Sequence, residues 1–189
     1  MGATYFRSVL GGAALAACLG GSISGAAADA QTDRGKYLVT VMGCGDCHTP
    51  GSFLGHPDKA RFLGGSDVGF AIPGLGVFVG RNLTPDDDTG LGKWTKEQII
   101  IAITTGARPD GRILAPIMPY ESFKSLTKAD AQAIAAYLKA LKPVKNAVPG
   151  PFGPSETPTT FVMAVMPGEV YAKMPKPPGP PAAGPPSKH

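Results

Sequence analysis

Apolar residues recur at three- and four-residue intervals in three segments of the chain, and this spacing predicts three amphipathic helices. In the first segment Asp33 is a candidate N-cap, and Tyr37, Leu38 and Val41 form an apolar stripe. The chain runs from this stripe directly into Cys44. The first predicted helix therefore ends where the cysteine-containing motif of the chain begins.

The second and third predicted helices lie in the later half of the chain, and each has a recognisable start and stop. The second begins at Thr95, where Gln98 completes a capping box, and it ends at Gly106. The third is capped by Thr127 and stops before Pro143. The apolar faces consist of Ile99, Ile100 and Ile103 in the second helix and of Ile134, Leu138 and Leu141 in the third.

Gly35 stands inside the first predicted helix, where a glycine costs about 1 kcal/mol relative to alanine. Close approach of another element is the usual compensation for such a glycine. The third predicted helix is rich in alanine, which permits close approach. We therefore expect the first and last helices to cross, with Gly35 near Tyr137 or Leu138.

The start of the chain has the pattern of a targeting segment. A short apolar run, Val9 to Leu19, precedes Ala28-Asp29-Ala30, which has the small-x-small form of a cleavage site. The run is short for a transmembrane helix. We predict a signal peptide over residues 1–30, export, and a periplasmic mature protein in a bacterium. A lipobox ending at Cys18 is the alternative, and it would add a lipid anchor to a membrane.

Composition points to long irregular segments. The 189 residues include 26 glycines and 20 prolines, and 13 of those prolines lie at or after Pro143. We expect a core domain over residues 31–149 and a proline-rich tail over 150–189, with residues 143–172 wrapping the domain and 173–189 disordered. The formal net charge of +4 is too weak and dispersed to indicate nucleic acid, although it would assist docking to an acidic protein.

The motif Cys44-Gly45-Asp46-Cys47-His48 has the spacing of a c-type haem attachment site. Two thiols three residues apart on a helical turn face the same side, so both can bond to the vinyl groups of one porphyrin. His48 would then be the proximal iron ligand. Three alternatives exist. The motif could be half of a zinc site, although a closed zinc site needs four ligands, or a thioredoxin-like redox pair, although such a pair needs a βαβ setting. The third alternative is a chance match.

A six-coordinate haem needs a second axial ligand, and Met118 is the best candidate by elimination among the six methionines. It lies between the second and third predicted helices, in an apolar segment stiffened by prolines on either side. Trp94 is a candidate indole donor to a haem propionate, or else a core aromatic. Arg108 and Arg112 flank a predicted turn and could neutralise propionates, although exposed loop positions would explain them equally.

The order of motifs from Thr32 to Pro149 resembles a class I cytochrome c domain, especially those of the cytochrome c subunits of alcohol and aldehyde dehydrogenases. The resemblance is carried by C-x-x-C-H-T-P, F-L-G-G, N-L-T-P-D, T-G-x-G-x-W-T, D-G-R and M-P-Y, in that order. It implies an all-α fold in which three main helices surround one covalently bound haem c. Those subunits commonly carry three such domains, whereas the sequence has one C-x-x-C-H motif.

Filled axial positions favour electron transfer over catalysis, because no substrate can reach the iron. We expect a monohaem carrier or subunit that takes single electrons from a periplasmic or membrane-bound dehydrogenase and passes them to a downstream cytochrome or oxidase. Contact with a membrane would come only through a Cys18 anchor or a partner subunit. The alternative is a haem enzyme, of peroxidase or thiosulfate-oxidising type, or a ligand sensor, and each needs an exchangeable sixth ligand.

Overall fold

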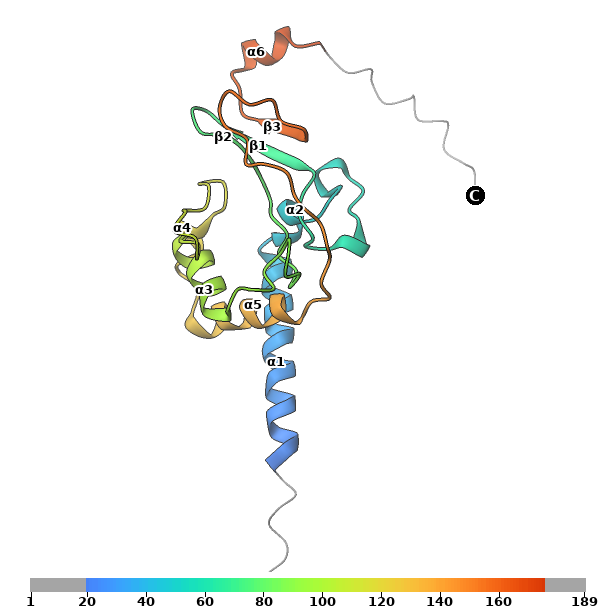
Figure 1. Ribbon diagram of the computed structural model, residues 1–189, viewed down its shortest axis with the longest axis vertical. Coiled ribbons are helices and arrows are strands. Elements are labelled where there is room, and N and C mark those ends of the chain that lie inside the picture. Colours follow the sequence, from blue (N-terminus) through green and yellow to red (C-terminus); the bar gives the residue numbers. More distant parts are fainter. Residues whose placement is uncertain (1–19, 176–189) are drawn as a thin grey trace, which may run out of the picture.

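The computed structural model describes residues 20–175 (Figure 1). That part of the chain contains helices, short 3-10 turns and one small sheet. The helices are α1 (Gly20–Val41), α2 (Cys44–His48), α3 (Lys96–Thr105), α4 (Tyr120–Phe123), α5 (Lys128–Ala140) and α6 (Gly168–Lys173). The 3-10 turns are η1 (Ser52–Leu54) and η2 (Lys59–Arg61), and the strands are β1 (Val68–Ile72), β2 (Gly76–Val79) and β3 (Phe161–Ala164).

Helices α1 and α5 cross at very close range, and Figure 1 shows α5 lying across α1. A methyl group added at Gly35 would lie 2.0 Å from the carbonyl oxygen of Ala133 and 2.7 Å from Cβ of Tyr137. Only a residue without a side chain fits this crossing. The predicted crossing of the first and last helices of the domain, with Gly35 against Tyr137, is confirmed.

The buried face of α1 differs from the predicted stripe. Tyr37 and Val41 are 57% and 58% exposed, whereas Leu38 and Val39 are buried in a core that also contains Ile99. The predicted start is also wrong, because α1 begins at Gly20 and passes through Asp33 without interruption. Residues 26–32, directly before Asp33, are rich in alanine and contain neither glycine nor proline, so the helix continues upstream of Asp33.

Residues 20–30 belong to α1, and residues 1–19, including Cys18, lie outside the described part of the chain. The signal peptide and its lipid-anchored alternative therefore stay predictions. Within residues 20–175, none of the helices combines the length and the apolar character needed to span a bilayer.

Local capping signals fix both ends of α3 and the start of α5. The Thr95 side chain accepts a hydrogen bond from the backbone N–H of Gln98, and the Gln98 side chain accepts one from the N–H of Thr95. Gly106 ends α3 in the left-handed region, with φ 76°. Thr127 caps α5 by accepting from the N–H of Asp130. These predicted boundaries are confirmed.

The predicted all-α fold class is wrong, because the described residues include a mixed three-stranded sheet with the order β2-β1-β3. Strands β1 and β2 form an antiparallel hairpin through a turn in which the N–H of Leu75 donates to the carbonyl of Ile72 at 3.0 Å. Strand β3 pairs in parallel with β1, placing Phe161 beside Val68. That pairing joins segments far apart in sequence, and periodicity carries no signal for it.

The segment between α5 and β3, residues 143–160, is here called the strap, and Figure 1 shows it running along the domain towards the sheet. The Asn146 amide donates to the carbonyl of Gly64 at 2.7 Å, and Val77 and Phe152 exchange two backbone hydrogen bonds of 2.9 Å. The expectation that this part of the tail wraps the domain agrees with these contacts. The division at residues 149/150 stays a prediction, and residues 176–189 lie outside the described part.

Candidate functional site

The two cysteines lie on the short helix α2, which follows α1 after a sharp change of direction. Gly43 provides that change by adopting the left-handed region, with φ 67°. Cys44 and Cys47 are both partly buried free thiols. The turn thus presents two unpaired thiols, three residues apart, immediately before His48.

His48 is held by the backbone of a segment on the far side of a long loop. Its Nδ1 lies 2.7 Å from the carbonyl oxygen of Arg81, and because a carbonyl can only accept, Nδ1 carries the proton. Burial lowers the pKa of His48, which favours the neutral imidazole. The ring therefore keeps a lone pair on Nε2, the nitrogen available to a metal.

Gly80 lets this segment approach the motif. A methyl group added at Gly80 would lie 1.8 Å from the carbonyl oxygen of Cys47 and 3.3 Å from Nδ1 of His48. Neither Gly80 nor Arg81 was predicted from the sequence as a site residue. A backbone acceptor has no residue-type signal, so only a glycine next to an extended apolar run could have hinted at this close approach.

The thiols have the electrostatics of buried groups rather than of redox-active ones. Burial raises the pKa of Cys44 to about 11 and also raises that of Cys47. Reactive dithiol pairs have lowered pKa values. In addition, residues 20–175 contain no group of three or more histidine, cysteine or acidic side chains arranged to hold a metal ion. The raised pKa values count against the thioredoxin-like interpretation.

A loop packs directly over the C-terminal end of α2. The N–H of Gly65 donates to the carbonyl of His48 at 2.8 Å, and the N–H of Leu63 donates to the Thr49 hydroxyl at 3.0 Å. An added methyl at Gly45 would lie 2.9 Å from the ring of Phe62. The predicted F-L-G-G motif therefore supports the cysteine-histidine turn.

Trp94 and Arg108, which come from different parts of the chain, lie together. The Arg108 guanidinium carbon is 5.8 Å from the centre of the Trp94 ring, within the range of a cation–π contact. The turn that carries Trp94 is held by Lys139, whose ammonium group donates to the carbonyls of Leu91 at 3.2 Å, Gly92 at 2.7 Å and Trp94 at 3.1 Å. Sequence reasoning missed Lys139.

Arg108 and Arg112 both form ion pairs with the Asp110 carboxylate, at nitrogen–oxygen distances of 3.1 and 2.7 Å, respectively. The hydrogen bond from Arg112 holds the pKa of Asp110 well below its usual range. Burial, and then the charges of Arg108 and Arg112, lower the pKa of Arg81. The three arginines are close enough to interact, and we call them the guanidinium cluster. The buried Nε of Arg108 has no hydrogen-bond partner, so an acceptor such as a carboxylate would satisfy it.

Met118 is half-buried in the turn before α4. Its N–H donates to the carbonyl of Ala115 at 2.9 Å, and its own carbonyl accepts from Tyr120 at 2.8 Å. The structure gives no contact between Met118 and His48. The role of Met118 as distal ligand therefore stays a prediction.

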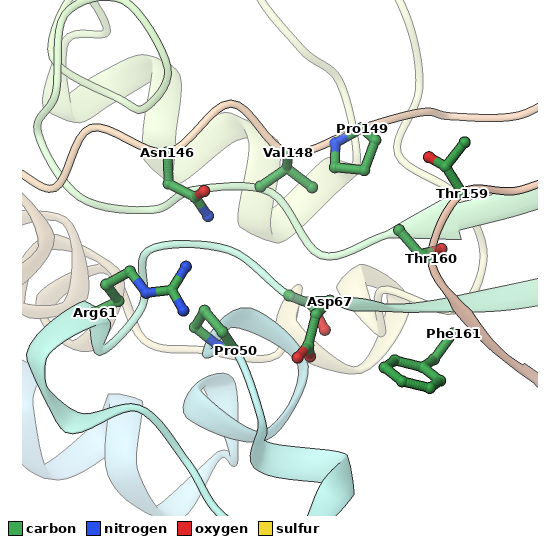
Figure 2. A pocket seen from close by; sticks show the side chains of 10 residues that line it. Pro50, Arg61, Asp67, Asn146, Val148, Pro149, Thr159, Thr160 and Phe161 are labelled. Atoms are coloured by element: carbon green, nitrogen blue, oxygen red, sulfur yellow. The ribbon is translucent and has the colours of Figure 1, made fainter.

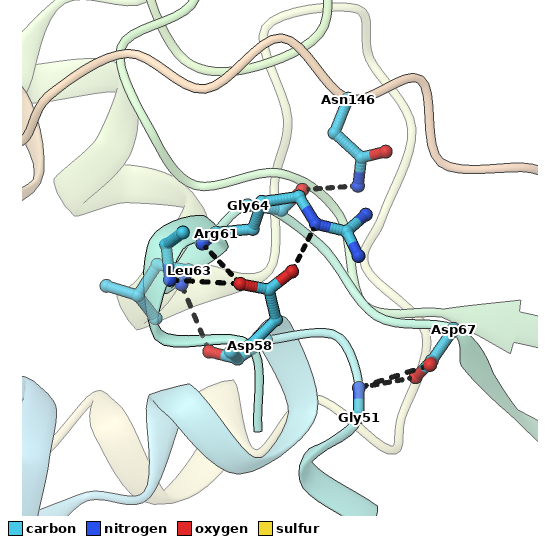
Figure 3. Close-up of polar contacts among 9 residues, drawn as sticks. Gly51, Asp58, Arg61, Leu63, Gly64, Asp67 and Asn146 are labelled. Carbon is cyan, nitrogen blue, oxygen red and sulfur yellow. Dashed lines mark hydrogen bonds and ion pairs between the residues drawn. The ribbon is translucent and has the colours of Figure 1, made fainter. Parts of the chain in front are cut away.

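A separate cavity of about 440 Å³ lies between the strap and the loop after α2, and Figure 2 shows its lining. Arg61, Asp67 and Asn146 contribute polar groups to the lining, together with the hydroxyl-bearing residues Ser66, Thr159 and Thr160. Figure 3 shows how two of them are held: Arg61 pairs with Asp58 at 2.7 Å, and Asp67 accepts from the N–H of Gly51 at 3.0 Å. None of the predicted haem residues lines this cavity.

The described residues fit a c-type haem. Two free thiols on one turn can form the two covalent bonds, and an imidazole with a protonated Nδ1 can offer Nε2 to iron. The guanidinium cluster, with its unpartnered Nε on Arg108, suits the two carboxylates of such a group.

Comparison with known proteins agrees with this chemistry. The family profile described as "Cytochrome c" matches residues 32–142. The chain is 36% identical over 126 residues to the fructose dehydrogenase cytochrome subunit of Gluconobacter japonicus, covering 63% of this chain and 24% of the relative. It is 35% identical over 116 residues to the cytochrome c subunit of the alcohol dehydrogenase (quinone) of Gluconacetobacter polyoxogenes, covering 61% and 23%.

A further relative is the diheme cytochrome c-type protein of Cereibacter sphaeroides, with 32% identity over 119 residues, covering 62% of this chain and 38% of the relative. The chain thus spans less than two fifths of the length of each of these three relatives. Their names describe cytochromes, two of them subunits of dehydrogenases.

Proposed function

This chain belongs to the cytochrome c family, and on that premise we propose that it binds one haem c and transfers single electrons. Membership of the family implies covalently bound haem, and one haem matches the one C-x-x-C-H motif in the sequence. Cys44 and Cys47 would form the thioether bonds, and His48 would be the proximal ligand. The observation that carries the proposal is the hydrogen bond from His48 to the Arg81 carbonyl, which leaves Nε2 for the iron.

The remaining contacts to the haem are assigned by position and chemistry. Met118 would be the distal ligand, which would raise the reduction potential relative to bis-histidine ligation. Arg108 and Arg112 would face the propionates, because both belong to the guanidinium cluster and Arg108 has an unpartnered buried Nε. The Trp94 indole would donate to the same carboxylates, since its ring lies against Arg108.

The chain's own residues would bind and tune the haem rather than carry out bond chemistry. When bound, the haem supplies an iron that accepts and releases one electron. His48 stays neutral and fixed in orientation, and the guanidinium cluster would offset the propionate charge. With both axial positions held by the chain, substrates would have no access to the iron.

A dehydrogenase is the proposed electron donor, and a downstream cytochrome or oxidase is the proposed acceptor. The relatives named as cytochrome subunits of fructose and alcohol dehydrogenases support the donor. The signal-like residues 1–30 support a periplasmic location. The formal net charge of +4 suits transient docking to an acidic surface, because electrostatic steering speeds encounter without tight binding.

Stopped-flow reduction by candidate dehydrogenases, measured across ionic strength, tests this function. We expect fast reduction that slows as salt rises, because screening removes the long-range attraction. Redox encounter interfaces are small, below about 1,200 Å², so affinity should be weak. Sustained turnover of a small substrate by the isolated protein, with no partner present, would instead indicate a haem enzyme and overturn the proposal.

A further inference from the structure

Arg81 contacts two different parts of the molecule with two different groups. Its backbone carbonyl accepts the hydrogen bond from Nδ1 of His48, at 2.7 Å. Its guanidinium donates to the carbonyl oxygens of Val148 and Gly150, which belong to the strap and lie 67 and 69 positions later in the chain. The same residue therefore connects the strap to the proximal histidine.

The strap is fixed on both sides of the carbonyls that hold Arg81. On one side Asn146 donates from its backbone N–H to the Thr89 hydroxyl at 3.0 Å and from its amide to Gly64, at 2.7 Å, as Figure 3 shows. On the other side Phe152 is bonded to Val77 in both directions at 2.9 Å. A planar guanidinium that meets two such fixed acceptors has little freedom, so the backbone of Arg81 is held as well.

We propose that Arg81 is a positioning residue for His48, through which the strap sets the reduction potential of the haem. The inference rests on the proposed function. The strap follows the last motif that carries the cytochrome c resemblance, M-P-Y, and it begins directly after the end of the family match at residue 142. This coupling gives that segment a role in tuning the electron carrier.

The direction of the effect follows from the chemistry of the proximal ligand. A short hydrogen bond from Nδ1 to a fixed carbonyl makes the imidazole a stronger electron donor, and a stronger donor favours ferric iron. Loosening the Arg81 carbonyl should therefore raise the reduction potential. The positive charge of the Arg81 guanidinium has the opposite effect from the hydrogen bond: it raises the reduction potential, because a nearby cation disfavours the ferric state. A lysine at this position keeps the charge and removes the planar fork, so it separates the two effects.

The test compares the Arg81→Lys and Asn146→Ala variants with the wild type, all as full-length, haem-loaded protein. Asn146→Ala loosens the strap without altering Arg81. We expect both variants to raise the reduction potential. For Arg81→Lys the ratio of reduced to oxidised protein at a fixed ambient potential should rise about threefold or more, where a tenfold change corresponds to about 59 mV for a one-electron couple. Solvent exchange of the His48 Nδ1 proton, followed by NMR in the reduced protein, should become at least about threefold faster in both.

Arg61→Lys is the matched control. Arg61 lines the cavity beside the strap, but its bond is to Asp58. Its replacement should change neither the potential nor the Nδ1 exchange. Unchanged potentials in Arg81→Lys and Asn146→Ala, with haem fully attached, would overturn the coupling and leave the proposed function intact. A shifted potential with unchanged Nδ1 exchange would also overturn it. A wild-type protein without covalent haem would instead refute the proposed function itself.

Discussion

Replacing Gly35 with alanine tests the crossing of α1 and α5 on which the domain is built. Two effects oppose each other. Alanine favours the helix by about 1 kcal/mol relative to glycine. Against this, the added methyl carbon would lie 2.0 Å from the Ala133 carbonyl oxygen, which belongs to the backbone and cannot rotate away. The helices must then separate, which loosens the packing of Leu38 and Val39 in the core.

Overpacking a core typically costs about 1–3 kcal/mol, and a clash with backbone belongs at the upper end of that range. Subtracting the helix-propensity gain leaves a net loss of about 2 kcal/mol. For a protein of this length each kcal/mol corresponds to about 2–4 °C in Tm, so Gly35→Ala should lower Tm by about 4–8 °C. Thermal unfolding of the haem-loaded protein, followed by far-ultraviolet circular dichroism, measures the change.

Gly168→Ala is the matched control, because a methyl group added at this first residue of α6 meets no atom within 4 Å. Its effect should stay within about 0.5 kcal/mol, as for ordinary surface substitutions. If Gly35→Ala were as stable as the wild type, or more stable, the close crossing would be refuted, since propensity alone would then decide the outcome.

Three further predictions concern the surroundings of the haem site and the α1–α5 contact. Lys139→Met removes a cation that donates to three carbonyls, so urea unfolding should show a loss of about 2–3 kcal/mol in the free energy of unfolding. The fluorescence emission of the single tryptophan should also shift. Lys142 is exposed, so the control variant Lys142→Met should change neither the stability nor the emission. Met118→Ala should move the ferric spectrum towards high spin, lower the potential and admit exogenous ligands; an unchanged spectrum would exclude Met118 as the ligand. Hydrogen bonding from Arg34 lowers the pKa of Asp130, so the pair stabilises the fold above the ordinary carboxyl pKa near 4 and loses that contribution as pH falls below it. Urea unfolding midpoints measured at pH 5 and at about pH 3 test this. Between these two pH values the Asp130→Asn variant should lose less stability than the wild type, and equal losses would contradict a stabilising Arg34–Asp130 pair.

Local signals in the sequence were enough to predict both ends of α3 and the start of α5. A capping box, a left-handed glycine and a threonine cap act within one turn, so Thr95, Gly106 and Thr127 could be interpreted from their immediate neighbours. Gly35 was also informative, because a glycine inside a helix needs a reason, and the reason is the backbone of α5.

Non-local pairing could not be predicted in the same way. Strand β3 is a short apolar segment whose four residues are all exposed, so its burial pattern carries no alternation. It is a strand because its backbone pairs with β1. The buried face of α1 was misplaced for a related reason: Gly35 sets which side of the helix meets α5, and Tyr37 and Val41 lie off that side.

The candidate site shows the same division between side chains and backbone. The residue types at Cys44, Cys47 and His48 indicate haem attachment by their spacing alone. The groups that hold them are mostly backbone atoms, including the Arg81 carbonyl on His48 and the three carbonyls on Lys139. Every residue has a carbonyl, so no pattern of residue types reveals which one accepts.

Covalent attachment of haem at Cys44 and Cys47 is the central claim, and peptide mass spectrometry after acid–acetone extraction tests it most directly. The extraction removes non-covalent haem. We expect the protein to stay coloured and the peptide that contains residues 44–48 to carry the mass of one haem on its two cysteines. A colourless protein, with that peptide unmodified and all haem in the extract, would contradict the account.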